Sequence, residues 1–184
     1  MPTDSELYNR YLRGDESAID ELMIRYGDRL TVFLNGYLHN WHDAEDLTIE
    51  AFARIAVKKP NINEGVGTFR AYLFKTARNL AARHRSLGAR MEVFSLDGME
   101  AELSGGGELE GLMQDKERQQ AVRLCLERID ARLKEVLWLV YVEDLSYKDA
   151  AKIMGVNKKR IDNLLIRAKE HMRRELDREG ISQC

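Results

Sequence analysis

Apolar residues recur every three or four positions along most of the chain, which is the spacing of a helix that buries one face. Stripes of this kind occupy residues 7–12 and 18–26, and Gly14-Asp15 between them predicts a break after which Asp15 caps the second helix. The clearest stripe follows at Leu30, Phe33, Leu34, Tyr37 and Leu38. The beginning of the chain therefore predicts three amphipathic helices.

Two more helices are predicted in the first half of the chain. The first covers residues 43–57 and is ended by Lys59-Pro60, because a residue that precedes proline avoids helical dihedral angles. Residues 61–67 then form a loop, and Thr68 caps a helix that runs to about Ser86. The apolar faces of the two helices contain Leu47, Ala51 and Ile55, and Phe69, Leu73, Ala77 and Leu80.

The second half of the chain begins with a segment of different composition. Residues 88–112 contain six glycines and scattered acids without an apolar period, which is typical of a flexible linker. A further helix is then predicted by Val122, Leu126, Ile129 and Leu133, and residues 137–142 are an apolar run. Because only two prolines interrupt 184 residues, we expect an all-α protein of two small helical domains.

Charged residues are segregated along the chain, although 29 basic and 31 acidic residues give a net charge of only −2. Residues 68–90 carry six bases and no acid, whereas residues 91–117 carry eight acids and one base. Residues 146–184 have ten bases and six acids. Basic surfaces attract the phosphates of nucleic acids, so the pattern predicts two such surfaces joined by an acidic connector. Solvated helix faces are the alternative explanation of this pattern.

Several other classes of protein find no support in the sequence. No segment approaches the roughly 18 apolar residues that span a bilayer, and no secretion signal follows Met1, so we expect a cytoplasmic protein without membrane insertion. Cys125 and Cys184 have neither disulfide nor metal spacing. A metal site on one helix is an alternative, but it needs matching ligands from another helix, so no metal or cofactor is expected. Its candidate ligands are His39, His42, Asp46 and Glu50.

Residues 144–169 predict a helix-turn-helix. Ser146 caps a first helix, Met154-Gly155 ends it, and Asn157 caps a second helix. The small residues Ala150 and Ala151 permit a close helix crossing. The buried positions are Ala150, Ala151 and Ile153, and Ile161, Leu164, Leu165 and Ala168.

The second helix of such a motif presents its first residues to the major groove of DNA. Here these residues are Lys158, Lys159 and Arg160. An ordinary helical hairpin with basic side chains in solvent is the alternative. Three nearby acids are unfavourable beside phosphates, namely Glu143, Asp149 and Asp162.

Four stretches resemble extracytoplasmic-function sigma factors, in the order of that family. The most specific is YVEDLSYKDAAKIMGVNKKRIDNLLIRAKEHMRREL, which is similar to the last conserved region. The family's polymerase-binding helix resembles DAEDLTIEAFARI, and its promoter-melting helix resembles TFRAYLFKTARNLAARHR. Its opening helices are similar to GDESAIDELMIRYGDRL. Together these stretches cover nearly all of the chain except the acidic segment.

This resemblance implies a sigma region 2 domain at residues 1–87, an acidic linker at 88–115 and a region 4 helix-turn-helix domain at 116–184. It implies a non-enzymatic factor that directs promoter-specific initiation of transcription. The implied partners are promoter DNA and core RNA polymerase, through the clamp helices of its largest subunit and the flap of its second largest. An anti-sigma factor is a usual further partner in the family.

The resemblance also implies three sets of site residues. The clamp helices face Asp43, Glu45, Asp46 and Glu50. The minus-ten element is contacted by Asn61, Asn63, Arg70, Tyr72, Lys75, Arg78, Asn79 and Arg83. The minus-thirty-five element is contacted by Lys158, Lys159, Arg160, Asn163 and Arg167. This chain departs from the family at Arg83, where aspartate is usual, and at Asp162, Asn163 and Leu164, where Lys, Ser and Arg are common, so an atypical minus-thirty-five sequence is expected.

Two other functions remain open from the residues. A helix-turn-helix regulator with an amino-terminal ligand or dimerisation domain would not co-purify with core polymerase. A helical metal enzyme built around His39, His42, Asp46 and Glu50 would contain stoichiometric iron, manganese or zinc.

Overall fold

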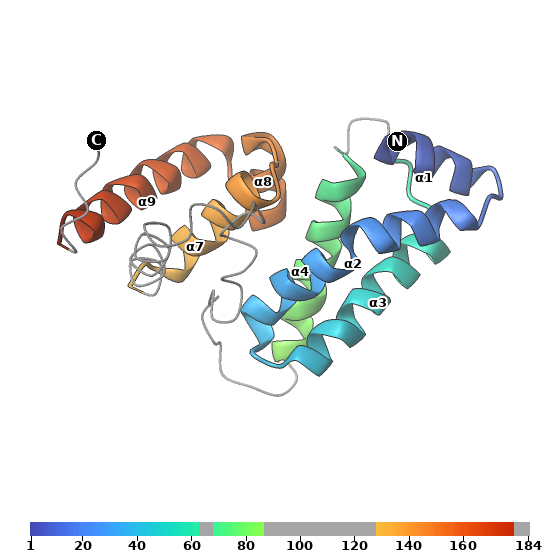
Figure 1. Ribbon diagram of the computed structural model, residues 1–184, viewed down its shortest axis with the longest axis horizontal. Coiled ribbons are helices and arrows are strands. Elements are labelled where there is room, and N and C mark those ends of the chain that lie inside the picture. The colour runs from blue at the N-terminus through green and yellow to red at the C-terminus, as the bar shows by residue number, and fades with distance from the viewer. Residues whose placement is uncertain (63–67, 87–127, 179–184) are drawn as a thin grey trace, which may run out of the picture. The chain divides into compact units, whose positions relative to one another are not determined.

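The computed structural model describes residues 1–62, 68–86 and 128–178, which consist of helices and short connections (Figure 1). The elements are α1 (Asp4–Leu12), α2 (Ser17–Leu38), α3 (Trp41–Lys58), α4 (Phe69–Ser86), α7 (Ala131–Leu137), the π-helical turn η1 (Trp138–Val142), α8 (Tyr147–Met154) and α9 (Lys158–Arg178). These residues contain no strand, which confirms the predicted all-α fold. The predicted linker and the helix marked by Val122 and Leu126 lie outside the described residues. Within the described ranges, no helix has the length and apolar character needed to cross a membrane.

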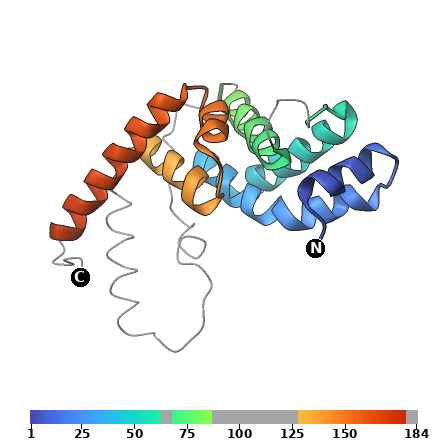
Figure 2. The same ribbon diagram turned by 90° about the horizontal axis from the view of Figure 1, so that it is seen from above.

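Helices α1 to α4 form a bundle in which α2 contacts each of the other three (Figures 1 and 2). Its interior is aromatic at the centre, where Phe33 lies edge-on to Phe74 with ring centroids 5.0 Å apart. A polar contact also crosses the interior, because the hydroxyls of Thr31 on α2 and Thr48 on α3 are 2.9 Å apart. The core further contains Leu7, Leu22, Leu30, Leu34, Ile55 and Leu73.

The prediction of two separate helices between residues 18 and 38 is wrong, because α2 is continuous through Gly27. A glycine inside a helix costs about 1 kcal/mol relative to alanine, and burial of its neighbours Tyr26 and Leu30 outweighs this cost. The predicted cap is also wrong. The carboxylate of Asp15 instead accepts hydrogen bonds from Arg10 Nε at 2.9 Å and from Ser17 Oγ at 2.6 Å.

The predicted ends of α3 and α4 are largely confirmed. Helix α3 begins two residues earlier than expected, because the side chain of Asn40 accepts from the backbone N–H groups of His42 and Asp43. It ends at Lys58, and the next residue, Lys59, adopts a left-handed conformation (φ 42°) immediately before Pro60. Thr68 starts α4, as predicted, because its Oγ1 accepts from the N–H of Ala71 at 3.2 Å.

The second group of helices begins with a turn. Residues 128–130 are not helical, and Asp130 caps α7 by accepting from the N–H of Arg132 at 2.9 Å. The predicted helix through Ile129 is therefore wrong at this position, although Ile129 is buried as its apolar character requires. The apolar run at residues 137–142 continues α7 as η1. Helix α7 packs against α9.

Candidate nucleic-acid interface

Helix α8 begins and ends as the sequence predicts. Its cap is Ser146, whose Oγ accepts from the N–H of Asp149 at 3.1 Å. The helix ends in a turn at Gly155, which has a φ of 67°, a conformation that glycine adopts without strain. In the same turn the N–H of Val156 donates to the carbonyl oxygen of Ala151 at 3.0 Å. These contacts leave a three-residue connection before the next helix, which is the length typical of a helix-turn-helix.

Helix α9 starts at the predicted cap. The side-chain oxygen of Asn157 accepts from the N–H of Arg160 at 2.8 Å, which fixes the first turn of the helix. All five side chains predicted to contact the minus-thirty-five element are exposed, namely Lys158, Lys159, Arg160, Asn163 and Arg167. A helix start carries partial positive charge, so three cations there form a surface suited to phosphates and to base edges.

The acids of this motif do not all oppose DNA binding. Glu143 is fully buried. Asp149 is 8% exposed, and its carboxylate accepts a hydrogen bond from the Ser146 hydroxyl at 2.8 Å. Asp162 is half-buried on α9. Leu164, at a position where the family commonly has arginine, is buried and takes part in the core instead. The exposed start of α9 is therefore mainly cationic.

Helix α4 carries the second basic surface. Tyr72, Lys75, Asn79 and Arg83 follow one another at spacings of three and four residues, so they share one face of the helix. Lys75, Asn79 and Arg83 are exposed, while Tyr72 and Arg78 are half-buried. The opposite face packs into the bundle through Phe69, Leu73, Phe74, Ala77, Leu80 and Ala81. The exposed face of α4 thus offers cations, an amide and an aromatic ring in one row.

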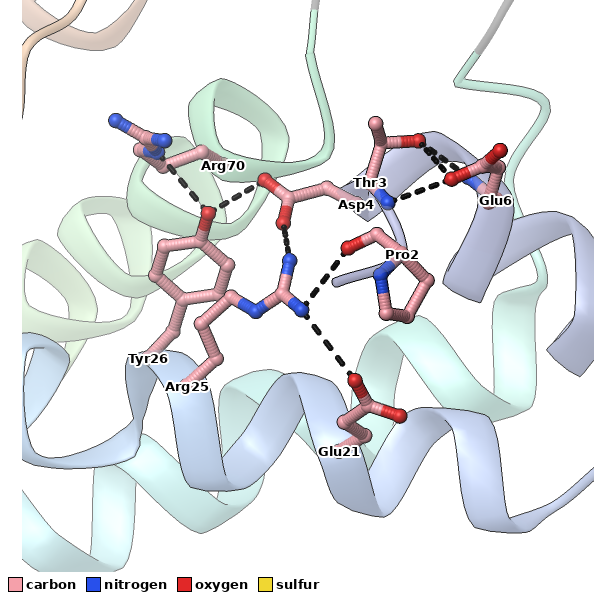
Figure 3. A network of polar contacts seen from close by, with 8 residues as sticks. All are labelled: Pro2, Thr3, Asp4, Glu6, Glu21, Arg25, Tyr26 and Arg70. Atoms are coloured by element: carbon pink, nitrogen blue, oxygen red, sulfur yellow. Dashed lines mark hydrogen bonds and ion pairs between the residues drawn. The ribbon is translucent and has the colours of Figure 1, made fainter.

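Arg70 lies apart from this row and is engaged within the protein (Figure 3). Its Nε donates to the hydroxyl of Tyr26 at 3.2 Å, and its guanidinium lies 5.4 Å from the centroid of the Tyr26 ring. The Tyr26 hydroxyl in turn donates to Asp4, and burial together with this hydrogen bond raises the pKa of Tyr26. The predicted contact of Arg70 with DNA stays a prediction, whereas its contact with α2 is observed.

The connection between α3 and α4 is described at its two ends. Asn61 is exposed, and Ile62 after it is buried. Asn63, the other predicted contact in this loop, lies outside the described residues. The carbonyl oxygen of Pro60 accepts a hydrogen bond from the hydroxyl of Tyr8 at 2.7 Å.

The four predicted polymerase-binding acids all lie on α3. Asp43, Asp46 and Glu50 share a face by their spacing, and Glu45 lies to one side, where its carboxylate accepts from Trp41 Nε1 at 3.0 Å. Glu50 pairs with Arg54 on the same helix at 2.6 Å, and Asp43 lies 3.5 Å from Nε2 of His84. Asp46 is exposed. Glu50 is thus paired with a cation of its own helix, and Asp43 lies beside an imidazole of α4.

Exposed apolar side chains beside these acids were not predicted as functional. Trp41, Ile49 and Val57 on α3 are 49%, 58% and 85% exposed. They lie outside the buried stripe of Leu47, Ala51 and Ile55. Apolar residues outside the buried stripe of a helix could have predicted this exposed surface from the sequence. Exposed apolar surface of this kind, rimmed by charges, is typical of protein interfaces.

The alternative metal site receives no support from the geometry. His39 follows the last residue of α2 and has a left-handed conformation (φ 50°). The other three candidate ligands lie on α3, so the four residues do not share one helix. Across residues 1–62, 68–86 and 128–178, no three His, Cys, Asp or Glu side chains gather as a metal-binding group.

Comparisons with known proteins agree with this arrangement. Residues 22–90 match the family model of sigma-70 region 2, and residues 119–172 match that of sigma-70 region 4. The ECF RNA polymerase sigma-E factor of Escherichia coli (strain K12) is 28% identical over 176 residues, which are 91% of this chain and 91% of that protein. The RNA polymerase sigma-H factor of Pseudomonas aeruginosa (strain PAO1) is 26% identical over 175 residues, covering 91% and 90%. The structure of CnrH in complex with the cytosolic domain of CnrY has a similar fold, with a TM-score of 0.60, 20% identity and coverage of 95% and 97%.

A helical bundle followed by a helix-turn-helix, matched in this order by sigma-70 regions 2 and 4, defines a transcription initiation factor of the sigma-70 class. The chain belongs to the extracytoplasmic-function family of RNA polymerase sigma factors.

Proposed function

We propose that this sigma factor binds core RNA polymerase and directs transcription from promoters that it recognises at two elements. The first domain, residues 1–87, binds the clamp helices and the minus-ten element. The second domain, residues 116–184, binds the flap and the minus-thirty-five element. The two domains are connected by residues 88–115. The observation that carries the proposal is the capped start of α9, which presents Lys158, Lys159 and Arg160 to solvent directly after a tight turn.

At the minus-thirty-five element, the start of α9 enters the major groove. Lys158 and Lys159 hold phosphates, and Arg160 addresses a base edge because its planar guanidinium can donate two hydrogen bonds to guanine. Asn163 and Arg167 continue the contact along the exposed face of α9. Because position 164 holds a buried leucine where the family commonly has arginine, this chain reads its element with fewer cations than is common in the family.

At the minus-ten element, the exposed row on α4 captures the melted strand. Lys75 and Arg83 follow the phosphates with Arg70 and Arg78, Asn79 contacts a base, and Tyr72 stacks beside the strand. Asn61 and Asn63 bind an extruded base in the loop before α4. Capture of this kind replaces ATP as the source of melting energy, because stacking contributes about 1 to 3 kcal/mol per base.

The polymerase is contacted by α3. Asp43, Glu45, Asp46 and Glu50 complement a basic partner, and the neighbouring Trp41 and Ile49 supply apolar area. Acids alone would give an interface of little affinity, because exposed ion pairs contribute only about 0 to 1 kcal/mol. The combination supports a specific protein contact at this helix.

We also propose that a regulatory anti-sigma factor binds this protein in the cytoplasm and that the protein has no catalytic activity of its own. CnrH, which shares the fold, has been solved in complex with the cytosolic domain of CnrY. The exposed apolar residues of α3 offer such a partner the same surface as the polymerase.

Transcription in vitro with purified core polymerase and a library of promoter fragments tests this function. The protein is expected to confer initiation on a subset of fragments that share two spaced elements. If the protein binds duplex DNA without core polymerase and never associates with it, the alternative of a helix-turn-helix regulator is correct.

A further inference from the structure

Helix α1 touches both ends of the connection between α3 and α4. Tyr8 makes both contacts with one side chain: its hydroxyl donates to the carbonyl oxygen of Pro60 at 2.7 Å, and its ring lies 5.4 Å from that of Phe69. Pro60 follows the end of α3, and Phe69 is the first residue of α4. The position of Tyr8 therefore relates the two ends of the connection to each other.

The α3 end is held by a second tyrosine of α1. The hydroxyl of Tyr11 donates to the carbonyl oxygen of Ala56 at 3.0 Å, in the last turn of α3. The ammonium group of Lys59 lies 5.1 Å from the centroid of the Tyr11 ring. Lys59 is in the left-handed conformation, so this cation–π contact lies where the chain leaves the helix.

The α4 end is held by residues from α1 and α2 (Figure 3). Asp4 of α1 accepts from Tyr26, and Tyr26 accepts from Arg70 in the first turn of α4. The other oxygen of Asp4 accepts from Arg25 at 2.7 Å, which also donates to the carbonyl oxygen of Pro2 at 3.1 Å. The amino-terminal residues are thereby tied to the start of α4.

Tyr8 is suited to a fixed structural contact. It is 1% exposed, and burial raises its pKa to about 12, so its phenol is protonated and can donate throughout the physiological pH range. Proline carries no N–H, and the Pro60 carbonyl lies one residue before the exposed Asn61. A hydrogen bond to this carbonyl fixes the peptide that leads into the loop.

We propose that α1 is a brace that sets the spacing of the two ends of the α3–α4 connection, and that Tyr8 is its positioning residue. The inference rests on the proposed function, in which this loop captures an extruded base of the minus-ten element. Residues that flank a binding segment lower the cost of binding when their positions are already fixed. Tyr8 thus acts on promoter melting without touching DNA.

The test compares Tyr8→Phe with Thr31→Val in the full-length protein. Tyr8→Phe keeps the ring contact with Phe69 and removes only the hydrogen bond to Pro60. Thr31→Val removes the buried contact with Thr48, which joins α2 to α3 elsewhere in the bundle. Both variants are studied at temperatures at which circular dichroism shows them to be folded.

The first measurement, made without polymerase, is amide hydrogen exchange at Lys59, Ala71 and Tyr72, whose N–H groups are hydrogen-bonded at the two ends of the connection. Tyr8→Phe is expected to accelerate exchange there by about two- to tenfold, the factor that corresponds to one net hydrogen bond, while Thr31→Val leaves these amides unchanged. Unchanged exchange in Tyr8→Phe, or equal acceleration in both variants, would overturn the brace.

The second measurement is promoter opening by the reconstituted holoenzyme, followed with a fluorescent base in the minus-ten element. For Tyr8→Phe the yield of open complex is expected to fall by a similar factor, while holoenzyme formation and binding to a minus-thirty-five duplex stay unchanged. An unaltered yield despite faster exchange would refute the link to melting. If the wild-type protein itself opens no promoter, the proposed function is wrong, and the exchange data still decide whether the brace exists.

Discussion

Ser146 and Asp149 cap α8 reciprocally. The N–H of Asp149 donates to Ser146 Oγ at 3.1 Å, and the Ser146 hydroxyl donates to Asp149 Oδ2 at 2.8 Å. The pair satisfies an N–H that has no partner within the helix, and it places a carboxylate near the positive end of the helix dipole. An acid that looked unfavourable for DNA binding therefore stabilises the motif that binds DNA.

Replacing Ser146 by alanine removes this cap. The free energy of unfolding is expected to fall by about 0.5 to 2 kcal/mol, the usual range for a lost helix cap, as measured by denaturant unfolding. Ser17→Ala is the matched control, because the Ser17 hydroxyl donates to the carboxylate of Asp15 rather than to a backbone group. A loss of the same size in both variants would argue against a special role of the Ser146 cap.

The helix starts at Ser146, Asn157 and Thr68 could be predicted because each cap involves residues within three positions along the chain. Long-range contacts could not. Arg70 bonds to Tyr26, which lies 44 residues earlier in the chain. The position of Arg70 among the cations of α4 indicated a contact with DNA, and nothing in the local pattern indicated the tyrosine. A periodic pattern identifies which face of a helix is buried, but it does not identify the partner of a polar group at the edge of that face.

The continuity of α2 was missed for a related reason. The apolar stripes before and after Gly27 predict separate helices, and the fold joins them because Tyr26 and Leu30 are both buried in the same core. For the acids of α3, the residues could be predicted from the sequence but their partners could not. Their types and positions were recognisable, yet the contact of Asp43 with His84 depends on how α4 packs against α3.

Charge reversal of Asp46 tests the proposed polymerase contact. Asp46→Lys is expected to weaken binding to core polymerase several-fold at moderate salt, because a cation then faces a basic partner, while helical content stays unchanged. Fluorescence titration of labelled protein with core polymerase measures the affinity. Glu50→Lys is less informative, because it also breaks the pair with Arg54 on the same helix.

Asp20→Lys is the control for this experiment, since Asp20 is an exposed acid on α2 outside the proposed interface. It makes the same change in net charge. Equal weakening by both variants would indicate a nonspecific electrostatic effect, and undiminished binding of Asp46→Lys would remove α3 Asp46 from the interface.

Glu175 is expected to give the stability of the carboxyl-terminal helices a dependence on pH. It is buried between Arg128, at 3.0 Å, and Arg178, at 2.6 Å, and the hydrogen bond from Arg128 is the largest of the effects that lower its pKa from 4.5. A carboxyl whose pKa is lower in the folded than in the unfolded state stabilises the fold above its unfolded pKa, and this contribution is lost as the pH falls through the folded pKa. Glu175→Gln is therefore expected to be less stable than the wild type at pH 7.

The difference in free energy of unfolding between wild type and Glu175→Gln is expected to shrink as the pH falls below about 4.5. Denaturant unfolding at several pH values measures it. Asp177→Asn serves as the control, because Asp177 is an exposed carboxylate on the same turn of α9. A difference that is independent of pH would show that packing, not the charge of Glu175, stabilises this contact.

Arg160 is the side chain that we expect to read a base at the minus-thirty-five element. It is exposed on the first turn of α9, where Asn157 holds its backbone N–H, and Lys158 and Lys159 precede it as compact charges better suited to phosphates. Arg160→Ala is expected to cost about 1 to 3 kcal/mol of binding free energy on the cognate duplex and much less on a scrambled one.

Lys158→Ala and Lys159→Ala are expected to weaken binding to both duplexes alike and to lower the salt dependence of binding by about one ion each. Arg174→Ala, an exposed arginine near the other end of α9, is expected to change neither quantity. Equal losses on cognate and scrambled duplexes for Arg160→Ala would make it a phosphate contact, and no loss for any of the three would mean that α9 does not enter the groove by its first turn.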